Sequence, residues 1–171
     1  YMIDPVARET QGLFDRLRST IPGLSSTAPE RRNFLGEVVK GPEMLGSRFL
    51  SPIRYSEDNE DPVYKEIARL SQSGFKVPGM PQRSIQHQNQ RVKLDGEQYS
   101  RFLAYSGTEH KINGKTLKAR LGQIVGSGAY QRATDEQKSS LIEDTVRTYR
   151  TAAKKVMIRN DSGIRYLLGM K

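Results

Sequence analysis

The chain has 171 residues, enough for one domain, but only 35% of them are hydrophobic and the mean hydropathy is −0.68. The absence of cysteine excludes disulfides, thiol nucleophiles and cysteine-based metal sites. The net charge of +9 attracts phosphate backbones and anionic membranes without any motif, and it serves simple solubility equally well. We therefore expect helices that each bury one apolar stripe, rather than an enzyme built on long apolar strands.

The ends of the chain carry no targeting signal that the sequence reveals. No stretch approaches the roughly 20 apolar residues of a membrane span. No basic start leads into an apolar run, as it does in a secretory signal. Tyr1 precedes Met2, so we expect either a remnant of a tag or the ordered part of a longer polypeptide.

The first predicted helix covers residues 4–21. Asp4 is a good N-cap, and Pro5 fits the first helical position. Pro22-Gly23 ends the helix. Its apolar face consists of Val6, Leu13, Leu17 and Ile21.

An extended arm is predicted over residues 24–60, where glycine and proline interrupt every regular pattern. Isolated pairs of apolar residues suit an arm that lies on a partner, because disordered linkers mostly lack such anchors. The candidate docking anchors are Phe34, Leu35, Phe49 and Leu50.

A short helix is predicted over residues 62–72, because Asp61-Pro62 repeats the opening of the first helix and apolar residues follow at helical spacing. The helix is expected to end near Gly74. Residues 75–91 cannot continue it, since Pro78 and Pro81 interrupt the stretch. We expect a second extended segment there, with one short strand.

Three helices are predicted after residue 92. Two capping-box patterns mark helix starts: Asp95 with Gln98 for the first helix, and Thr134 with Gln137 for the last. Gly107 is expected to stop the first, and Asn113-Gly114 to form a turn before the second. The expected ranges are about 95–107, 117–125 and 135–159, with Gly163 breaking the chain before a short apolar tail.

The predicted fold class is therefore mainly α: a small helical bundle with long extended arms and little or no sheet. Residues 1–92 form a helix-plus-arm region, with helices at about 4–21 and 62–72, and residues 93–171 form a helical domain. No βαβ alternation and no internal repeat occurs.

The patterns that carry catalytic or metal chemistry are not found. His87 and His110 lie in different segments, so we expect no metal site and no cofactor. Gly126-Ser127-Gly128 follows a predicted helix rather than a strand, which favours a helix C-cap over an exposed nucleophile. The Gly-Lys-Thr at 114–116 lacks the first glycine of a phosphate loop. The acidic cluster at 57–61 is explained by helix capping, and we expect no enzymatic activity.

A non-specific nucleic-acid interface is the site that the sequence supports best. Arg147, Arg150 and Lys154 are spaced i, i+3, i+7 on the long helix, and a predicted Glu143–Arg147 pair accompanies them. The alternative is a solvated helix face. The candidate phosphate contacts are Arg31, Arg32, Lys118, Arg147, Arg150 and Lys154.

A series of motifs resembles one family. In chain order they are Pro22-Gly23-Leu24-Ser25, Pro29-Glu30-Arg31-Arg32-Asn33-Phe34-Leu35-Gly36-Glu37, Ser51-Pro52-Ile53, Asp61-Pro62-Val63, Glu66-Ile67-Ala68-Arg69-Leu70, Pro78, Pro81, Val92-Lys93-Leu94, Glu97-Gln98-Tyr99, Lys115-Thr116-Leu117, Tyr130, Tyr149-Arg150 and Ala152-Ala153. The series covers nearly the whole chain and is similar to a domain near the C-terminus of large proteins of tailed bacteriophages and prophages. Those proteins are described as internal virion, ejection or tail-length-related proteins.

The resemblance implies a structural segment of a virion protein, and it carries over no catalytic residue. It implies docking on portal, tail or other virion proteins in several copies, in the capsid interior or the tail. It also implies release with the DNA to help genome passage across the host envelope. The alternatives are a non-specific DNA-binding protein, or a non-catalytic domain of a giant phage cell-wall hydrolase or polymerase.

Overall fold

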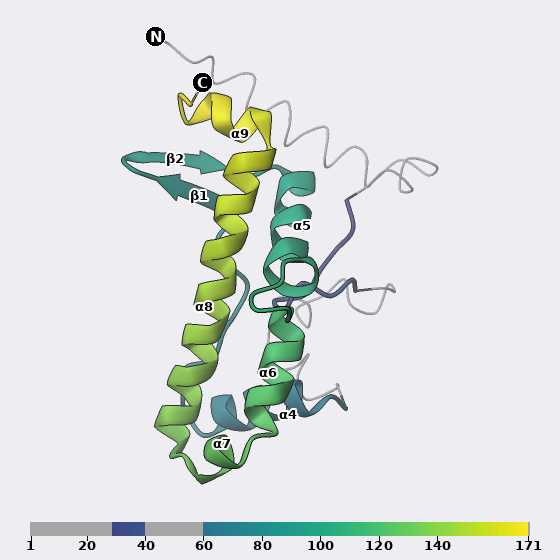
Figure 1. Ribbon diagram of the computed structural model, residues 1–171, viewed down its shortest axis with the longest axis vertical. Coiled ribbons are helices and arrows are strands. Elements are labelled where there is room, and N and C mark those ends of the chain that lie inside the picture. The colour runs from purple at the N-terminus through teal and green to yellow at the C-terminus, as the bar shows by residue number, and fades with distance from the viewer. Residues whose placement is uncertain (1–28, 40–59, 171) are drawn as a thin grey trace.

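The computed structural model describes residues 29–39 and 60–170, and within them the fold is mainly α-helical (Figure 1). The predicted helix over 4–21 and the anchors Phe49 and Leu50 lie outside the described residues. The described elements are α4 (Pro62–Gln72), β1 (Ser84–His87), β2 (Gln90–Lys93), α5 (Gly96–Ala104), the π-helical turn η3 (Tyr105–Glu109), α6 (Leu117–Val125), α7 (Gly128–Arg132), α8 (Asp135–Asn160) and α9 (Ser162–Leu167).

The predicted helix starts are confirmed, because side-chain caps act locally and can be read from sequence. Asp61 accepts a hydrogen bond from the Val63 amide at the start of α4. Both capping boxes form: Asp95 with Gln98 on α5, and Thr134 with Gln137 on α8. Each such cap stabilises its helix by about 1 kcal/mol.

Of three glycine-based predictions, one is confirmed and two are wrong. Gly107 does not stop a helix, because the chain continues from α5 through η3 to Glu109. The C-cap predicted at Gly126-Ser127-Gly128 is confirmed, because Gly126 caps the C-terminus of α6, and the Ser127 hydroxyl then caps the short helix α7. Gly163 does not break the chain: Asp161 ends α8 and caps α9, in which Gly163 lies.

The sheet is one antiparallel hairpin in which Ser84 pairs with Lys93 and His87 with Gln90. Residues 75–91 were expected to hold one short strand, and they hold β1 and the start of β2 instead. Ile85 and Val92 form a register pair and are both buried, so the hairpin places one face on the body of the molecule.

Helix α8 runs the length of the molecule, with α5, η3 and α6 following one another along its side (Figure 1). Two hydrophobic clusters lie along it. We call the first the arm cluster; it contains Phe34, Leu35, Val63, Tyr64, Ile67, Leu70, Leu117, Leu121, Val125, Tyr130, Ile142, Val146 and Tyr149. We call the second the hairpin cluster; it contains Ile85, Val92, Leu94, Phe102, Ala153, Met157, Ile164 and Leu168. Each cluster joins residues from both sides of the expected boundary at residue 92.

The arm at residues 29–39 crosses the helical column where two glycines meet. Gly36 has φ +83°, and a Cβ there would lie 2.3 Å from the Leu103 carbonyl oxygen. A Cβ at Gly107 would lie 1.8 Å from the Leu35 carbonyl oxygen. Gly107 of the π-helical turn and Gly36 of the arm therefore allow the two backbones to touch. A larger side chain at either position would push the arm away from η3.

Candidate interaction surfaces

A buried polar network fixes the arm to the helices. Asn33 is 1% exposed; its Oδ1 accepts hydrogen bonds from the Leu35 and Glu37 amides at 2.9 and 3.1 Å. Its Nδ2 donates to the Tyr64 hydroxyl at 2.7 Å, and that hydroxyl donates to the Glu37 carboxylate. Because each buried polar group is paired, the network holds the arm in one position on α4.

Lys118 belongs to this network. Its ammonium group lies 2.6 Å from Glu37 and 3.2 Å from Asp61, and 4.8 Å from the centre of the Tyr64 ring. Burial opposes the charged form, but the two carboxylates outweigh it and hold the pKa of Lys118 above its usual value. Lys118 therefore closes the arm onto α6, and its ammonium group is bound by carboxylates of the same chain.

Arg150 also points inward rather than into solvent. Its Nη2 donates to the carbonyl oxygens of Phe34, at 3.1 Å, and Gly79, at 2.5 Å. Its Nε is buried without a hydrogen-bond partner. Burial lowers the pKa of this guanidinium to about 10. Arg150 lies at the border of the buried stripe of α8, and its guanidinium group is bound within this chain.

The other four predicted contacts are dispersed. Arg32 donates to the Gly36 carbonyl at 2.9 Å and pairs with Glu30 at 2.7 Å, so it stabilises the turn of the arm. Arg147 is exposed and pairs with Asp144. Arg31 is exposed on the arm, and Lys154 is half-buried on α8. The six residues therefore do not form one surface.

The predicted ion pair between Glu143 and Arg147 is also wrong. Glu143 instead forms an ion pair with Lys76, in the loop between α4 and β1, at 2.8 Å. Arg147 pairs with Asp144, three residues before it on the same helix face. Residues at i−3 and i−4 are both neighbours of a helical side chain, so Asp144 and Glu143 compete for Arg147.

The anchors Phe34 and Leu35 do bury their side chains, but against this chain itself. They are 2% and 0% exposed, and Phe34 packs edge-on against Tyr64, with ring centres 5.6 Å apart. Both belong to the arm cluster, so they are not available to another protein. Apolar pairs in a sequence reveal burial without revealing what buries them, and here the covering surface belongs to the same chain.

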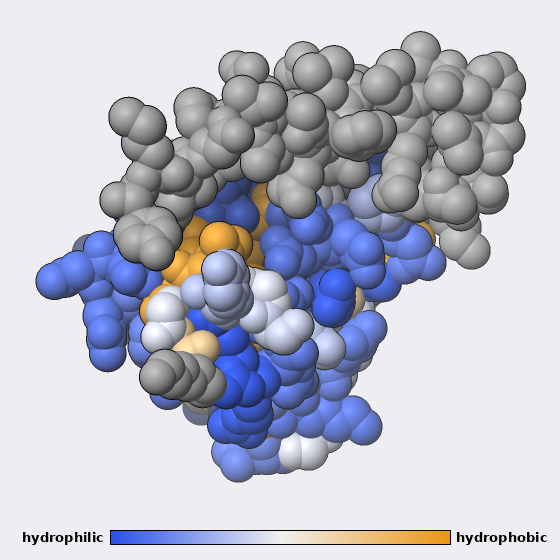
Figure 2. Space-filling view, turned by 90° about the horizontal axis from the view of Figure 1, so that it is seen from above, coloured by the Kyte–Doolittle hydropathy of each residue, from blue (hydrophilic) through white to orange (hydrophobic). Residues whose placement is uncertain are grey.

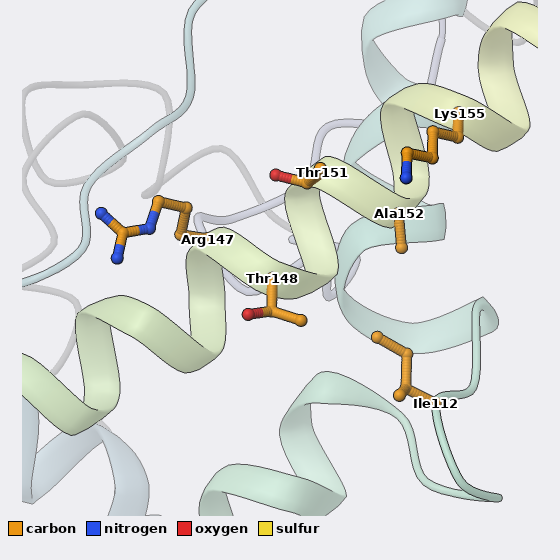
Figure 3. A pocket seen from close by; sticks show the side chains of 6 residues that line it. All are labelled: Ile112, Arg147, Thr148, Thr151, Ala152 and Lys155. Carbon is orange, nitrogen blue, oxygen red and sulfur yellow. The ribbon is translucent and has the colours of Figure 1, made fainter.

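A basic surface that the sequence did not single out lies on the C-terminal half of α8. We define it by Lys111 and Lys115, which flank Ile112 in the turn after η3, and by Lys155 and Arg159 of α8. Between the turn and α8 lies an open hollow of about 390 Å³. The residues lining the hollow are Ile112, Arg147, Thr148, Thr151, Ala152 and Lys155 (Figure 3).

The position of the turn is fixed by two contacts. The Tyr149 hydroxyl donates to the Lys115 carbonyl oxygen at 2.6 Å. Ile112 and Lys115 form an isolated bridge around Asn113 and Gly114, both at positive φ, which confirms the predicted turn. The backbone of the turn is thereby held beside α8, while the Lys115 ammonium group donates to the Gln123 side chain of α6 at 2.7 Å.

Exposed apolar side chains gather at the C-terminal helix. Tyr166 is 83% exposed and Leu167 49%, and Met170 follows them. Seen from the α9 end, a hydrophobic patch stands out from a surface that is otherwise mostly hydrophilic (Figure 2). These residues belonged to the predicted apolar tail, but sequence periodicity did not show that they stay on the surface.

Within residues 29–39 and 60–170, no group of three or more His, Asp or Glu side chains could hold a metal ion. None of the described helices combines the length and apolar character that a membrane span requires. Comparisons with protein-family models, with curated proteins and with solved structures give no match.

Proposed function

We propose that the chain is a structural segment of a tailed-phage virion protein, an internal or ejection protein that docks at the portal–tail axis and leaves with the DNA. The proposal rests on the order of motifs in the sequence. The comparisons do not contribute to it.

One observation supports it best: motifs that are far apart in the sequence contact each other in pairs. Arg150 donates to the Phe34 carbonyl across 116 positions. The Tyr130 hydroxyl donates to Glu66 at 2.9 Å across 64 positions, and that of Tyr149 to Lys115 across 34. The motifs therefore belong to one folded unit. Their contacts fix the position of the chain rather than that of a reacting group.

Docking on another virion protein requires exposed apolar side chains, and Phe34 and Leu35 do not provide them. Tyr166, Leu167 and Met170 on and after α9 do. We assign the docking role to this end of the molecule, with a virion protein of the portal or tail as the occupant. Aromatic and methionine side chains are the types that protein interfaces enrich.

The test is mass spectrometry of purified particles of the phage or induced prophage that encodes the chain. Peptides from residues 60–170, present at several copies per particle and joined to flanking sequence, are the expected result. Absence of these peptides from clean particles, with their presence in the infected cell, would refute the virion proposal. Cell-wall hydrolysis by the purified segment would refute the structural role.

A further inference from the structure

Charge is distributed unevenly along α8. The first twelve residues, 135–146, carry four acidic side chains and one lysine. The remaining residues, 147–160, carry Arg147, Arg150, Lys154, Lys155 and Arg159, without an acidic side chain. The helix dipole favours positive side chains at the C-terminal end of a helix, but this effect is confined to the last turn. Among the five cations, it therefore explains the position of Arg159 alone.

Two of the remaining cations have partners that explain them. Arg150 binds backbone carbonyls inside the molecule, and Arg147 pairs with Asp144. Lys155 and Arg159 are exposed and form no ion pair with any described residue. Two exposed cations on a single helix are ordinary, so the residues that face them decide whether they form a site.

The turn across the hollow brings further positive charge to the same place. Thr148, Ala152, Lys155 and Arg159 are spaced i, i+4, i+7 and i+11, so they form one stripe of α8. Figure 3 shows Thr148 and Ala152 on the side of α8 toward Ile112, with Lys155 further along the helix, while Arg147 extends away from Ile112. Lys111 precedes Ile112, Lys115 pairs with it across the turn, and Glu109 is the one acidic residue between 105 and 120.

The hollow suits a negatively charged backbone better than a small molecule or a stacked base. It is open, and its lining combines the hydroxyl groups of Thr148 and Thr151 with the cations Arg147 and Lys155 of α8. None of its lining residues is aromatic, whereas single-strand binding depends on bases stacked on aromatic rings. Cations along α8, together with the two lysines of the adjoining turn, match the phosphates of a duplex, which are bound without sequence preference.

We propose that Lys111, Lys115, Lys155 and Arg159 form a phosphate-binding surface for duplex nucleic acid. The surface binds through charge and without base contacts, and the sequence patterns did not select Lys111, Lys155 or Arg159 for this role. The inference is independent of the virion proposal, because it concerns binding by the purified chain.

The experiment measures fluorescence anisotropy of a labelled duplex of about 25 random base pairs, titrated with the full chain at several salt concentrations. Three to four phosphate contacts give a slope of log K against log salt of about −3, hence on the order of 50-fold weaker binding between 50 and 200 mM salt. The variant K111Q/K115Q/K155Q/R159Q is expected to bind at least about 10-fold more weakly, with a slope near −1.

The matched control is R31Q/R91Q/K93Q/R132Q, which removes the same charge from the arm, the hairpin and α7. It is expected to keep the slope of the parent chain. Equal losses in both variants would overturn the proposal, since binding would then reflect net charge alone. Absence of duplex binding at 50 mM salt, or stronger binding to phosphatidylserine vesicles than to DNA, would also overturn it. Thermal unfolding of each variant verifies that it is folded.

Discussion

The two clusters along α8 differ in how their charges are satisfied. Around the arm cluster, Lys118 lies between Glu37 and Asp61, and Arg69 binds both Glu66 and Asp135. Around the hairpin cluster, Lys155 and Arg159 lack an ion pair with a described residue, and Tyr166 is largely exposed. The first end of the molecule thus pairs these cations with carboxylates of the chain, whereas the second leaves Lys155 and Arg159 exposed, although Arg101 and Gln98 bind Asp161 there.

If this comparison is right, changes at the arm cluster reduce folding stability, and changes at the other end reduce association. The largest effect is expected for Gly107→Ala, because its Cβ would collide with the Leu35 carbonyl oxygen and push the arm away from η3. We expect a loss of at least about 3 kcal/mol in the free energy of unfolding by urea.

Gly122→Ala is the matched control for that change. Gly122 lies within α6, and nothing lies within 4 Å of the Cβ that it would gain. Alanine there is expected to stabilise the chain by about 0.5–1 kcal/mol. Similar losses from the two substitutions would show that the contact between arm and η3 is not tight.

The next largest effect is expected for Tyr64→Phe, which removes the hydroxyl that joins Asn33 to Glu37. Leaving the buried Asn33 amide without this partner is expected to lower stability by about 1–3 kcal/mol. Tyr166→Phe serves as the control, because the hydroxyl of this exposed side chain bonds to no described residue; its effect should stay below about 0.5 kcal/mol. A Tyr64→Phe protein as stable as the parent chain would argue against the network.

A smaller, pH-dependent effect is expected at Glu66. The hydrogen bond from Arg69 is the main cause that lowers the pKa of this carboxyl, and the Tyr130 hydroxyl adds to it, while burial opposes the shift. A lowered pKa in the folded state means that the stabilisation is present above the usual pKa of 4.5 and is lost as the pH falls through the folded value.

Urea denaturation between pH 7 and 3 tests this expectation. Glu66→Gln should be less stable than the parent chain at pH 7, and the two should converge in acid. Glu97→Gln is the control, because Glu97 is 77% exposed and its pair with Arg101 is worth less than about 1 kcal/mol. A constant difference between Glu66→Gln and the parent at every pH would contradict the assignment.

The smallest effect on stability is expected at α9. Tyr166→Ser with Leu167→Ser should change the unfolding free energy by less than about 0.5 kcal/mol, since both side chains are exposed. Incorporation of the chain into particles, followed by mass spectrometry, should nevertheless fall several-fold. Unchanged incorporation would show that the docking surface does not include these two side chains.

Local signals in the sequence predicted much of the helical fold. Asp61, Asp95 and Thr134 marked the starts of helices that the structure confirms, because an N-cap acts on the amide groups two or three residues ahead of it. The same reasoning failed at Gly107. A glycine that usually ends a helix is required here by the backbone of the arm, which is about 70 residues away.

The candidate site was less predictable for a related reason. Helical spacing placed Arg150 beside Arg147 and Lys154, but no pattern revealed that its partners are carbonyl oxygens, which every residue possesses. Phe34 was recognised as an anchor, yet the surface that covers it comes from Tyr64 of the same chain. The basic surface was missed because the turn at 111–115 meets α8 only in three dimensions.

The contact of Arg150 with backbone oxygens bears on how such a chain can diverge. A carbonyl group is present whatever side chain its residue carries, so substitution at Gly79 leaves this acceptor in place. Replacement of Arg150 removes both hydrogen bonds together. We therefore expect that a distant homologue can differ in the side chains of the arm motif and still fold its arm in the same way. The arginine at the position of Arg150 is the residue that we expect such a homologue to retain.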